Sequence, residues 1–258
     1  MTFTFYKFDG AGNDFVMVDN RSLLWQPAVD EVARICHRRF GVGADGLITL
    51  DRAADGYDFA MNYYNSDGRL GSMCGNGGRC IAAFAHMLGL GTELNFTGFD
   101  GPHRASVLSW DGRAGVVDLG MREVSKQGVA AVEGGWFLDT GSPHFVLPVA
   151  DLDDYDVVGQ GRRLRQRADL FPQGANIDFV ERRPDGRLAI RTYERGVEDE
   201  TWACGTGVTA AALATGVTGI VARGGSFEVR YTDAPAAYSD IHLIGPVSLD
   251  FEGLWTTK

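Results

Sequence analysis

The stretches M-C-G-N-G-G-R-C at 73–80 and A-C-G-T-G-V at 203–208 share a Cys-Gly-x-Gly core, and each leads into a run of small apolar residues. Their cysteines, Cys74 and Cys204, lie 130 residues apart in a chain of 258 residues. This spacing of half a chain length indicates a duplicated unit. Because glycines allow a tight first turn and the small residues that follow suit a packed helix, a helix is expected after each cysteine.

The composition is typical of a globular chain and argues against several classes of partner. Hydrophobic residues make up 45% and charged residues 22%, and the net charge is −10, so nucleic acid is not an expected partner. A charged and apolar leader pattern is missing at the N-terminus, and no apolar run approaches the roughly 18 residues that span a bilayer. We therefore expect a cytoplasmic protein with no membrane partner.

The cysteines favour reduced thiols over a metal site. A cytoplasmic location would keep the four cysteines, Cys36, Cys74, Cys80 and Cys204, mostly reduced. None of them forms the C-x-x-C pair that is usual in structural zinc sites, so no metal is expected. Cys36 and Cys80 are expected to be small buried apolar residues, as free cysteines often are.

The two halves of the chain repeat one order of elements. In each half, strand-like patterns surround one small-residue helix, and G-A-G-N-D-F-V at 10–16 is echoed by G-A-N-I-D-F-V at 174–180. A linker-like stretch, V-S-K-Q-G-V-A-A-V-E-G-G, occupies 124–135. The sequence therefore predicts an α/β fold with two domains, 1–122 carrying Cys74 and 123–258 carrying Cys204. Further helices are expected at 27–39 and about 159–170, and the chain is expected to end in strands at 227–232, 239–244 and 247–251.

A cysteine at a helix start has a specific chemical meaning. The first N–H groups of a helix lack partners within the helix, and the helix dipole places partial positive charge there. Such an end binds a carboxylate and favours the thiolate form of a nearby thiol. Two such ends facing one ligand suit stereoinversion at carbon: one thiolate removes a proton from one face, and the other thiol delivers a proton to the opposite face. This chemistry needs no cofactor, and no lysine near the motifs suggests pyridoxal phosphate.

Two other classes of function use the same cysteines. A thiol hydrolase or acyltransferase would need one cysteine with His144 and an orienting group, but it would leave the second Cys-Gly-x-Gly without a role. A redox protein would form a disulfide between Cys74 and Cys204. We expect that disulfide only as an inactivating event, which a reductant would reverse.

The ordered motifs of the chain resemble the diaminopimelate epimerase family over nearly the whole length. The motifs are G-N-D-F at 12–15, G-V-G-A-D-G-L at 41–47, N-S-D-G at 65–68, M-C-G-N-G-G-R-C at 73–80, P-H-F-V at 143–146, G-A-N-I-D-F at 174–179, Y-E-R-G at 193–196 and A-C-G-T-G at 203–207. The resemblance implies two pseudo-symmetric domains, each a curved, mainly antiparallel sheet around a central helix, with the active site in the cleft between them. It also implies cofactor-independent epimerisation of L,L- to meso-diaminopimelate by Cys74 and Cys204, in a homodimer.

The resemblance assigns roles to further residues. Donors to the reacting carboxylate would be Gly75, Asn76, Gly205 and Thr206, with Asn13 shaping the same end. The thiols would be tuned by His144 and by Glu194, which would also contact the substrate. The distal amino-acid end would be bound by Asn65, Asn176 and Arg195. Simpler roles remain open at this stage: the asparagines at 13 and 65 could support turns, and Glu194 with Arg195 could form a surface ion pair.

Two positions depart from the family pattern. Ser142 stands before P-H where the family usually has asparagine, so distal-end recognition could use water or a shifted contact. Gly78 stands where alanine is common, at a cost of up to about 1 kcal/mol in a helix. A racemase for proline or hydroxyproline is the alternative within the same fold; those relatives usually carry histidine after the first Cys-Gly, where this chain has Asn76.

Overall fold

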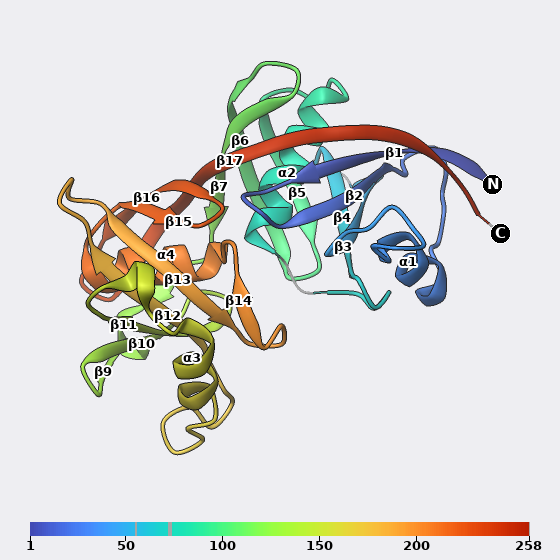
Figure 1. The fold of residues 1–258 in the computed structure, drawn as a ribbon. Coiled ribbons are helices and arrows are strands. Elements are labelled where there is room, and N and C mark those ends of the chain that lie inside the picture. The colour runs from blue at the N-terminus through green and yellow to red at the C-terminus, as the bar shows by residue number, and fades with distance from the viewer. Residues whose placement is uncertain (55, 72–73, 258) are drawn as a thin grey trace. The chain divides into compact units, whose positions relative to one another are not determined.

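A computed structural model describes residues 1–54, 56–71 and 74–257, so Met73 of the first cysteine stretch lies outside the described residues (Figure 1). The chain forms two compact units, one of Met1–Leu119 with Gly245–Lys258 and one of Gly120–Ile244. The expected domains, 1–122 and 123–258, have one boundary, between residues 122 and 123. The observed units have two boundaries, after Leu119 and after Ile244. The difference arises because the last strand returns to pair with the first.

The first unit contains seven strands and two helices within its continuous part. They are β1 (Thr2–Asp9), β2 (Asp14–Asp19), α1 (Val29–Cys36), β3 (Gly46–Asp51), β4 (Phe59–Asn65), α2 (Gly75–Met87), β5 (Glu93–Gly98), β6 (Gly101–Trp110) and β7 (Ala114–Met121). The parallel pairs are β2 with β3, joined through α1, and β4 with β5, joined through α2. The other neighbours, β1–β2, β3–β4, β5–β6 and β6–β7, are antiparallel.

The second unit begins with the short elements β8 (Val124–Ser125), η1 (Lys126–Gly128) and β9 (Ala130–Val132). There follow β10 (Gly135–Asp139), β11 (Pro143–Pro148), η2 (Leu152–Asp154), α3 (Val157–Arg165), β12 (Asn176–Arg182), β13 (Leu188–Glu194), β14 (Asp199–Thr201), α4 (Gly205–Thr215), β15 (Gly219–Ala222), β16 (Gly225–Asp233) and β17 (Ala237–Thr256). The parallel pairs are β11 with β12 and β13 with β15, joined through α3 and α4.

The two units therefore repeat one topology. Each runs strand, strand, helix, strand, strand, helix, strand, strand, strand, with parallel pairing across each helix and antiparallel pairing elsewhere. The second unit adds the short strand β14, which pairs antiparallel with β13 before α4 begins. In this repeat α2 corresponds to α4 and β3 corresponds to β12. The predicted α/β fold with two similar units, each mainly antiparallel, is confirmed.

The cysteine helices form the centre of each unit. All eleven residues from Gly75 to Ala85 in α2 are buried, as are the six from Val208 to Leu213 in α4. A helix that is apolar and buried on every side must be surrounded by the rest of its unit, and Figure 1 shows α2 among the strands of the first unit. Small side chains on these helices allow the strands to pack closely around them.

Several sequence expectations differ from the observed elements. Helix α1 ends at Cys36, three residues before the expected end, because His37 adopts an extended backbone. Helix α3 begins earlier than expected because the Asp156 carboxylate caps it, accepting from the N–H of Gly159. The linker-like stretch at 124–135 contains β8, η1 and β9.

Two further expectations are wrong. One strand, β17, replaces the two expected at 239–244 and 247–251, because pairing with β16 and then with β1 keeps the chain extended across Gly245 and Pro246. The echo between 10–16 and 174–180 also does not align the units, because its first copy enters β2 and its second enters β12, which corresponds to β3.

Candidate active site

Cys74 and Cys204 occupy the same position in the repeat, the N-cap of the central helix. Both have extended backbone, with φ of −110° and −115°, and their carbonyl groups accept the first helical hydrogen bonds, from the N–H groups of Gly78 and Val208. The N–H groups of the next two residues, which are Gly75 and Asn76 in α2 and Gly205 and Thr206 in α4, lie in the first turn, where a helix has no partners for them. Each cysteine thus lies directly before the first-turn N–H groups of a helix, and the helix expected after each cysteine is present.

In the first unit, Cys74 is linked to two of the predicted residues. The Cys74 thiol donates to Oδ1 of Asn13 at 3.5 Å, and Nδ2 of Asn76 donates to the same oxygen at 3.4 Å. Asn76 also accepts a hydrogen bond from the fully buried Arg79, between its Oδ1 and Nη2 at 3.0 Å. The structure therefore brings Cys74, Asn13 and Asn76 together.

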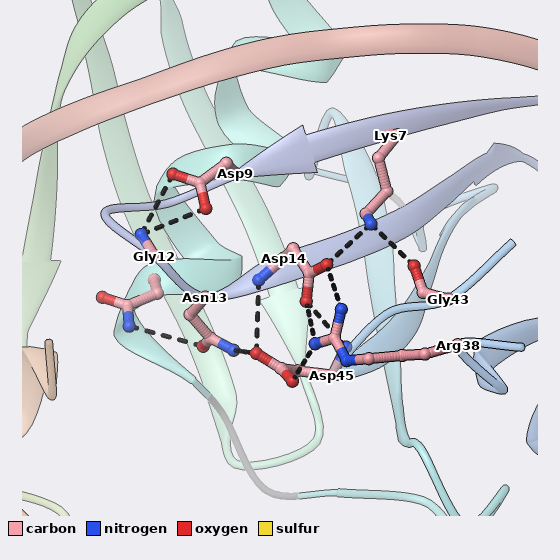
Figure 2. A network of polar contacts seen from close by, with 9 residues as sticks. Lys7, Asp9, Gly12, Asn13, Asp14, Arg38, Gly43 and Asp45 are labelled. Carbon is pink, nitrogen blue, oxygen red and sulfur yellow. Dashed lines mark hydrogen bonds and ion pairs between the residues drawn. The ribbon is translucent and has the colours of Figure 1, made fainter. Parts of the chain in front are cut away.

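A network of charged residues holds Asn13 in place (Figure 2). Asn13 donates through Nδ2 to Oδ2 of Asp45 at 2.8 Å, and the other oxygen of Asp45 accepts from Arg38 at 2.7 Å. Arg38 binds both oxygens of Asp14, at 2.9 and 2.8 Å, and Lys7 donates to Asp14 at 2.6 Å. An ionised carboxylate can only accept, so Asp45 fixes which end of the Asn13 amide faces Cys74.

Electrostatics reinforce this network at its buried end. Burial acts to raise the pKa of the Asp14 carboxyl, but the hydrogen bonds and charges of Arg38 and Lys7 hold that pKa well below its usual range. Lys7 is itself buried and also donates to the carbonyl oxygen of Gly43 at 2.6 Å. Asp14 is therefore a permanent anion between two cations at neutral pH.

Asn65 belongs to a different local structure. Its side-chain amide donates to the carbonyl oxygen of Arg69 at 3.5 Å, and its backbone closes the turn after β4 through Gly68 and Arg69. This side chain is exposed. The structure shows Asn65 supporting an exposed turn, and its contact with a substrate stays a prediction.

In the second unit, a chain of side chains leads away from Cys204. The Cys204 sulfur lies 3.3 Å from Oγ1 of Thr206, and that oxygen lies 2.9 Å from Nε2 of His144. The other ring nitrogen of His144, Nδ1, lies 2.6 Å from Oδ2 of Asp178. His144 and Asp178 are both completely buried, with 0% of each side chain exposed. Cys204, Thr206 and His144 are thus brought together, and Asp178 joins them.

Asn176 connects this series of side chains to Ser142 and to Arg195, which is predicted to bind the distal end of the substrate. Its Nδ2 lies 2.8 Å from Oγ of Ser142, 3.0 Å from the carbonyl oxygen of Pro143 and 3.3 Å from Nε2 of His144. Its Oδ1 accepts from the backbone N–H of Arg195 at 2.8 Å. Ser142 therefore contacts Asn176 directly, and the Arg195 backbone is tied to the same amide.

The charges around Cys204 oppose its ionisation. Burial raises the pKa of the Cys204 thiol well above its ordinary value, and the carboxylates of Glu194 and Asp178 add to the rise. Hydrogen bonds from the Thr206 side chain and the backbone N–H of Gly207 act in the opposite direction. Glu194 is thus placed near Cys204, as the sequence predicts, and its effect is to hold the proton on sulfur.

The sequence motifs assign no role to Asp178, Asp45, Arg38 or Lys7. Asp45 lies within the family-like motif G-V-G-A-D-G-L, so a signal for it exists. Asp178 follows Asn176 in G-A-N-I-D-F-V, two residues along the same strand. Alternate residues of a strand share a face, which is the signal that could have placed Asp178 beside the predicted asparagine.

Within 1–54, 56–71 and 74–257, no group of three or more His, Cys, Asp or Glu side chains gathers in a way that could hold a metal ion. Across the same residues, no helix is both long and apolar enough to cross a membrane.

Comparison with known proteins gives the chain its family. The sequence matches the family model described as diaminopimelate epimerase over residues 5–121 and 136–234. The chain belongs to the diaminopimelate epimerase family. A diaminopimelate epimerase of Flavobacterium psychrophilum is 42% identical over 258 residues, covering 96% of this chain and 98% of the relative. That of Chlorobaculum tepidum is 45% identical over 210 residues, covering 79% and 80%. The chain is accordingly an enzyme of the isomerase class.

Solved structures with low sequence identity share the fold. A PhzF-family phenazine biosynthesis protein of Bacillus anthracis has a TM-score of 0.72 at 13% identity, covering 100% of both chains. A probable proline racemase of Agrobacterium radiobacter K84 has a TM-score of 0.68 at 16% identity, covering 99% of this chain and 92% of that one. At such identities the likeness concerns the fold alone, and it matches the two-unit topology described above.

Proposed function

We propose that this enzyme inverts one α-carbon of L,L-diaminopimelate to give the meso isomer, using Cys74 and Cys204 as the two acid–base groups and no cofactor. The observation that carries the proposal is that both cysteines occupy the N-cap position of a buried central helix, at the same place in a structural repeat. The reaction would lie on the route to lysine and peptidoglycan.

The thiolate of one cysteine takes the α-proton, and the thiol of the other gives a proton to the opposite face. The substrate keeps its atoms, and the two sulfurs exchange protonation states. The negative charge that develops on the reacting carboxylate is stabilised by the first-turn N–H groups of Gly75, Asn76, Gly205 and Thr206. This mechanism requires both thiols to reach the same α-carbon.

The remaining predicted residues take supporting roles in the proposal. His144 and Glu194 tune the thiols, Asn13 shapes the end of the site at Cys74, and Arg195 binds the distal carboxylate through its guanidinium fork. Asn176 and Asn65 complete the distal contacts. The contacts of Asn176 with Ser142 and with the Arg195 backbone support a shared distal region. We also propose a cytoplasmic homodimer, as is usual in the family.

The decisive experiment measures the incorporation of deuterium from solvent into the substrate. Reduced, metal-free protein is incubated with L,L-diaminopimelate in D2O, and NMR records deuterium at the α-carbons while chromatography records the meso isomer. We expect deuterium to enter at the inverted centre, without added cofactor. Deuterium exchange into proline or hydroxyproline, but not into diaminopimelate, would assign one of those amino acids as the substrate. No exchange into any of them would reject the racemase chemistry.

Cysteine variants separate the two-thiol mechanism from single-cysteine chemistry. Cys74→Ser and Cys204→Ser are each expected to lose at least about a hundredfold in turnover, since serine is a far weaker acid and base than cysteine. Cys36→Ala is the matched control, because Cys36 is buried at the end of α1 and burial raises its pKa to about 12. Full turnover by Cys204→Ser would favour a mechanism that uses Cys74 alone.

A further inference from the structure

His144 is surrounded by groups whose hydrogen-bonding roles are fixed. The backbone N–H of Arg195 can only donate, so the atom of Asn176 that faces it is the amide oxygen. The carbonyl oxygen of Pro143 can only accept, so the amide nitrogen of Asn176 faces it. That nitrogen, which can only donate, also lies 3.3 Å from Nε2 of His144. The two protons on this nitrogen are shared among Ser142, Pro143 and His144, and a proton on Nε2 would point at a donor, so the contact favours a lone pair on Nε2.

The other ring nitrogen contacts Asp178. Ionised Asp178 has only acceptors, and it receives the Thr192 hydroxyl at 2.7 Å on Oδ1 and the Nδ1–H of His144 at 2.6 Å on Oδ2. Thr192 and Asn176 are buried, with 3% and 2% exposed, and both groups of the His144–Asp178 pair are fully buried, so water does not compete for these contacts. These contacts favour the tautomer of His144 that carries a proton on Nδ1.

We propose that Asp178 is a positioning residue: it holds His144 in this tautomer and orientation, so that Nε2 can accept the proton of Cys204 through the hydroxyl of Thr206. The inference rests on the proposed function of Cys204. In the proposed relay, the Thr206 hydroxyl donates to Nε2 and its oxygen accepts from the thiol while Cys204 is protonated, and the hydroxyl donates to sulfur once the thiolate has formed. When the thiol proton moves to the Thr206 oxygen and the hydroxyl proton moves to Nε2, sulfur becomes a thiolate and His144 an imidazolium, with no atom gained or lost.

The local charges explain why such an arrangement is needed. The carboxylates of Glu194 and Asp178 disfavour an isolated thiolate at Cys204, and the hydrogen bonds from Thr206 and from the N–H of Gly207 offset them only in part. An imidazolium at His144 would offset those charges, and Asp178 would stabilise that cation through Nδ1–H, as a carboxylate does for the histidine of a serine-hydrolase triad.

The first unit has no carboxylate at the position equivalent to Asp178. At the repeat spacing of 130 residues between the cysteines, the position equivalent to Asp178 is Ile48, on the corresponding strand β3. Cys74 instead donates to the amide oxygen of Asn13, which lacks a basic nitrogen. Asp178 therefore serves the second unit, and its effect should appear in the chemistry of Cys204.

The test combines NMR of His144 with kinetics, both on the full chain. In wild-type protein, two-bond ¹⁵N–¹H correlation spectra at neutral pH are expected to show the Nδ1–H tautomer for His144, assigned by comparison with His144→Gln. In Asp178→Asn, we expect a change to the Nε2–H tautomer and a fall in kcat for diaminopimelate of at least about a hundredfold, with KM changed less than about threefold, by analogy with loss of the correct tautomer in a triad.

Controls separate this role from a loss of folding. Asp51→Asn makes the same chemical change at a carboxylate of the first unit that also has several side-chain partners, Asn20, Thr49 and Asn62, and it should keep both the His144 tautomer and kcat. Detection of the Nε2–H tautomer of His144 in wild-type protein would overturn the proposal, even if the Asp178→Asn protein does not fold. Wild-type kcat in a folded Asp178→Asn also overturns it. The tautomer is read without substrate, so failure of the deuterium experiment would be a separate result.

Discussion

The two thiols occupy equivalent positions but contact different side chains. Cys74 donates to the Asn13 amide, and Cys204 contacts the Thr206 hydroxyl, which leads to an imidazole. The charged network of Figure 2 fixes the first contact, and the buried Asp178 fixes the second. The same backbone arrangement is therefore used with two sets of side chains, which differ in their ability to take up a proton.

The pH dependence of alkylation tests the surroundings of Cys204. Because burial and nearby carboxylates raise its pKa, the unreactive thiol form is expected to persist to higher pH than in a free cysteine, whose pKa is about 8.5. In Cys74→Ser protein, iodoacetamide labelling at Cys204, measured by mass spectrometry, should reach half its maximal rate above that pH. A midpoint at or below about 8.5 would contradict the assignment.

The candidate site divides into parts that the sequence predicts and parts that it cannot. The helix starts at Cys74 and Cys204 are predictable because all the determining residues are local. The contact of Asp178 with His144 is not predictable from local residues, since Asp178 lies 34 residues from His144 in an ordinary strand pattern. Only the parallel register of β11 with β12, which sets His144 opposite Asn176, brings the pair together. Sequence patterns report local structure well and long-range register poorly.

At the level of elements, a glycine in the third position of each central helix allows close packing on a strand. A Cβ on Gly207 would lie 2.6 Å from Oδ1 of Asp178 and 3.2 Å from Cε1 of His144. A Cβ on Gly77 would lie 2.9 Å from Cδ1 of Ile48, the mobile end of a flexible side chain. The equivalent glycines of α2 and α4 therefore face different obstacles.

These two glycines give a paired prediction. Alanine in a helix is favoured over glycine by up to about 1 kcal/mol, so Gly77→Ala should leave the free energy of unfolding within about 1 kcal/mol of the wild type. Gly207→Ala should destabilise by about 1–3 kcal/mol, as crowding in a packed core does, and should lower kcat, because Asp178 is held by Thr192 and His144. Urea unfolding and steady-state kinetics measure both effects. Equal stability of the two variants would contradict the packing argument.

The strand β17 shows that a local turn signal in the sequence does not always end a strand. Gly245-Pro246 has the composition of a turn, yet it lies within a strand of 20 residues. The strand continues because β16 pairs with its first part, and β1 pairs with its last part from Thr2↔Thr256 to Asp9↔Ser248. Pairing partners that are remote in sequence override a local preference, which explains why two strands are expected and one is found.

At the scale of the whole molecule, the last strand completes the first unit. The Trp255 side chain packs against the core cluster that contains Phe3, Val18 and Leu47, and the Arg34 guanidinium lies 4.5 Å from its ring centroid. Residues 245–256 thus contribute both backbone partners for β1 and side chains for the core. The first unit depends on residues encoded after the entire second unit.

Truncation tests this dependence. A chain ending at Ile244 removes the β17 partner of β1 and leaves only β2, which pairs with Tyr6–Asp9. Hydrogen exchange at the amides of Thr2–Phe5, which lie outside the β1–β2 register, should therefore be at least about tenfold faster, since unpaired backbone opens easily. The pairs Val229↔Leu243 and Glu228↔Ile244 remain, so protection of β16 should persist. A chain ending at Thr256 is the control and should match the wild type. Unchanged protection of β1 in the shorter chain would contradict the prediction.

The return of the last strand also creates an opportunity for protein engineering. The amino group of Met1 donates to Oγ1 of Thr257 at 2.8 Å, and the Thr257 N–H donates to the Met1 carbonyl at 2.9 Å. A short linker could join these neighbouring ends, and the chain could be opened in the loop at 122–123. In the resulting circular permutant, each folding unit would be encoded by one nearly uninterrupted stretch, so that either could be expressed or labelled separately.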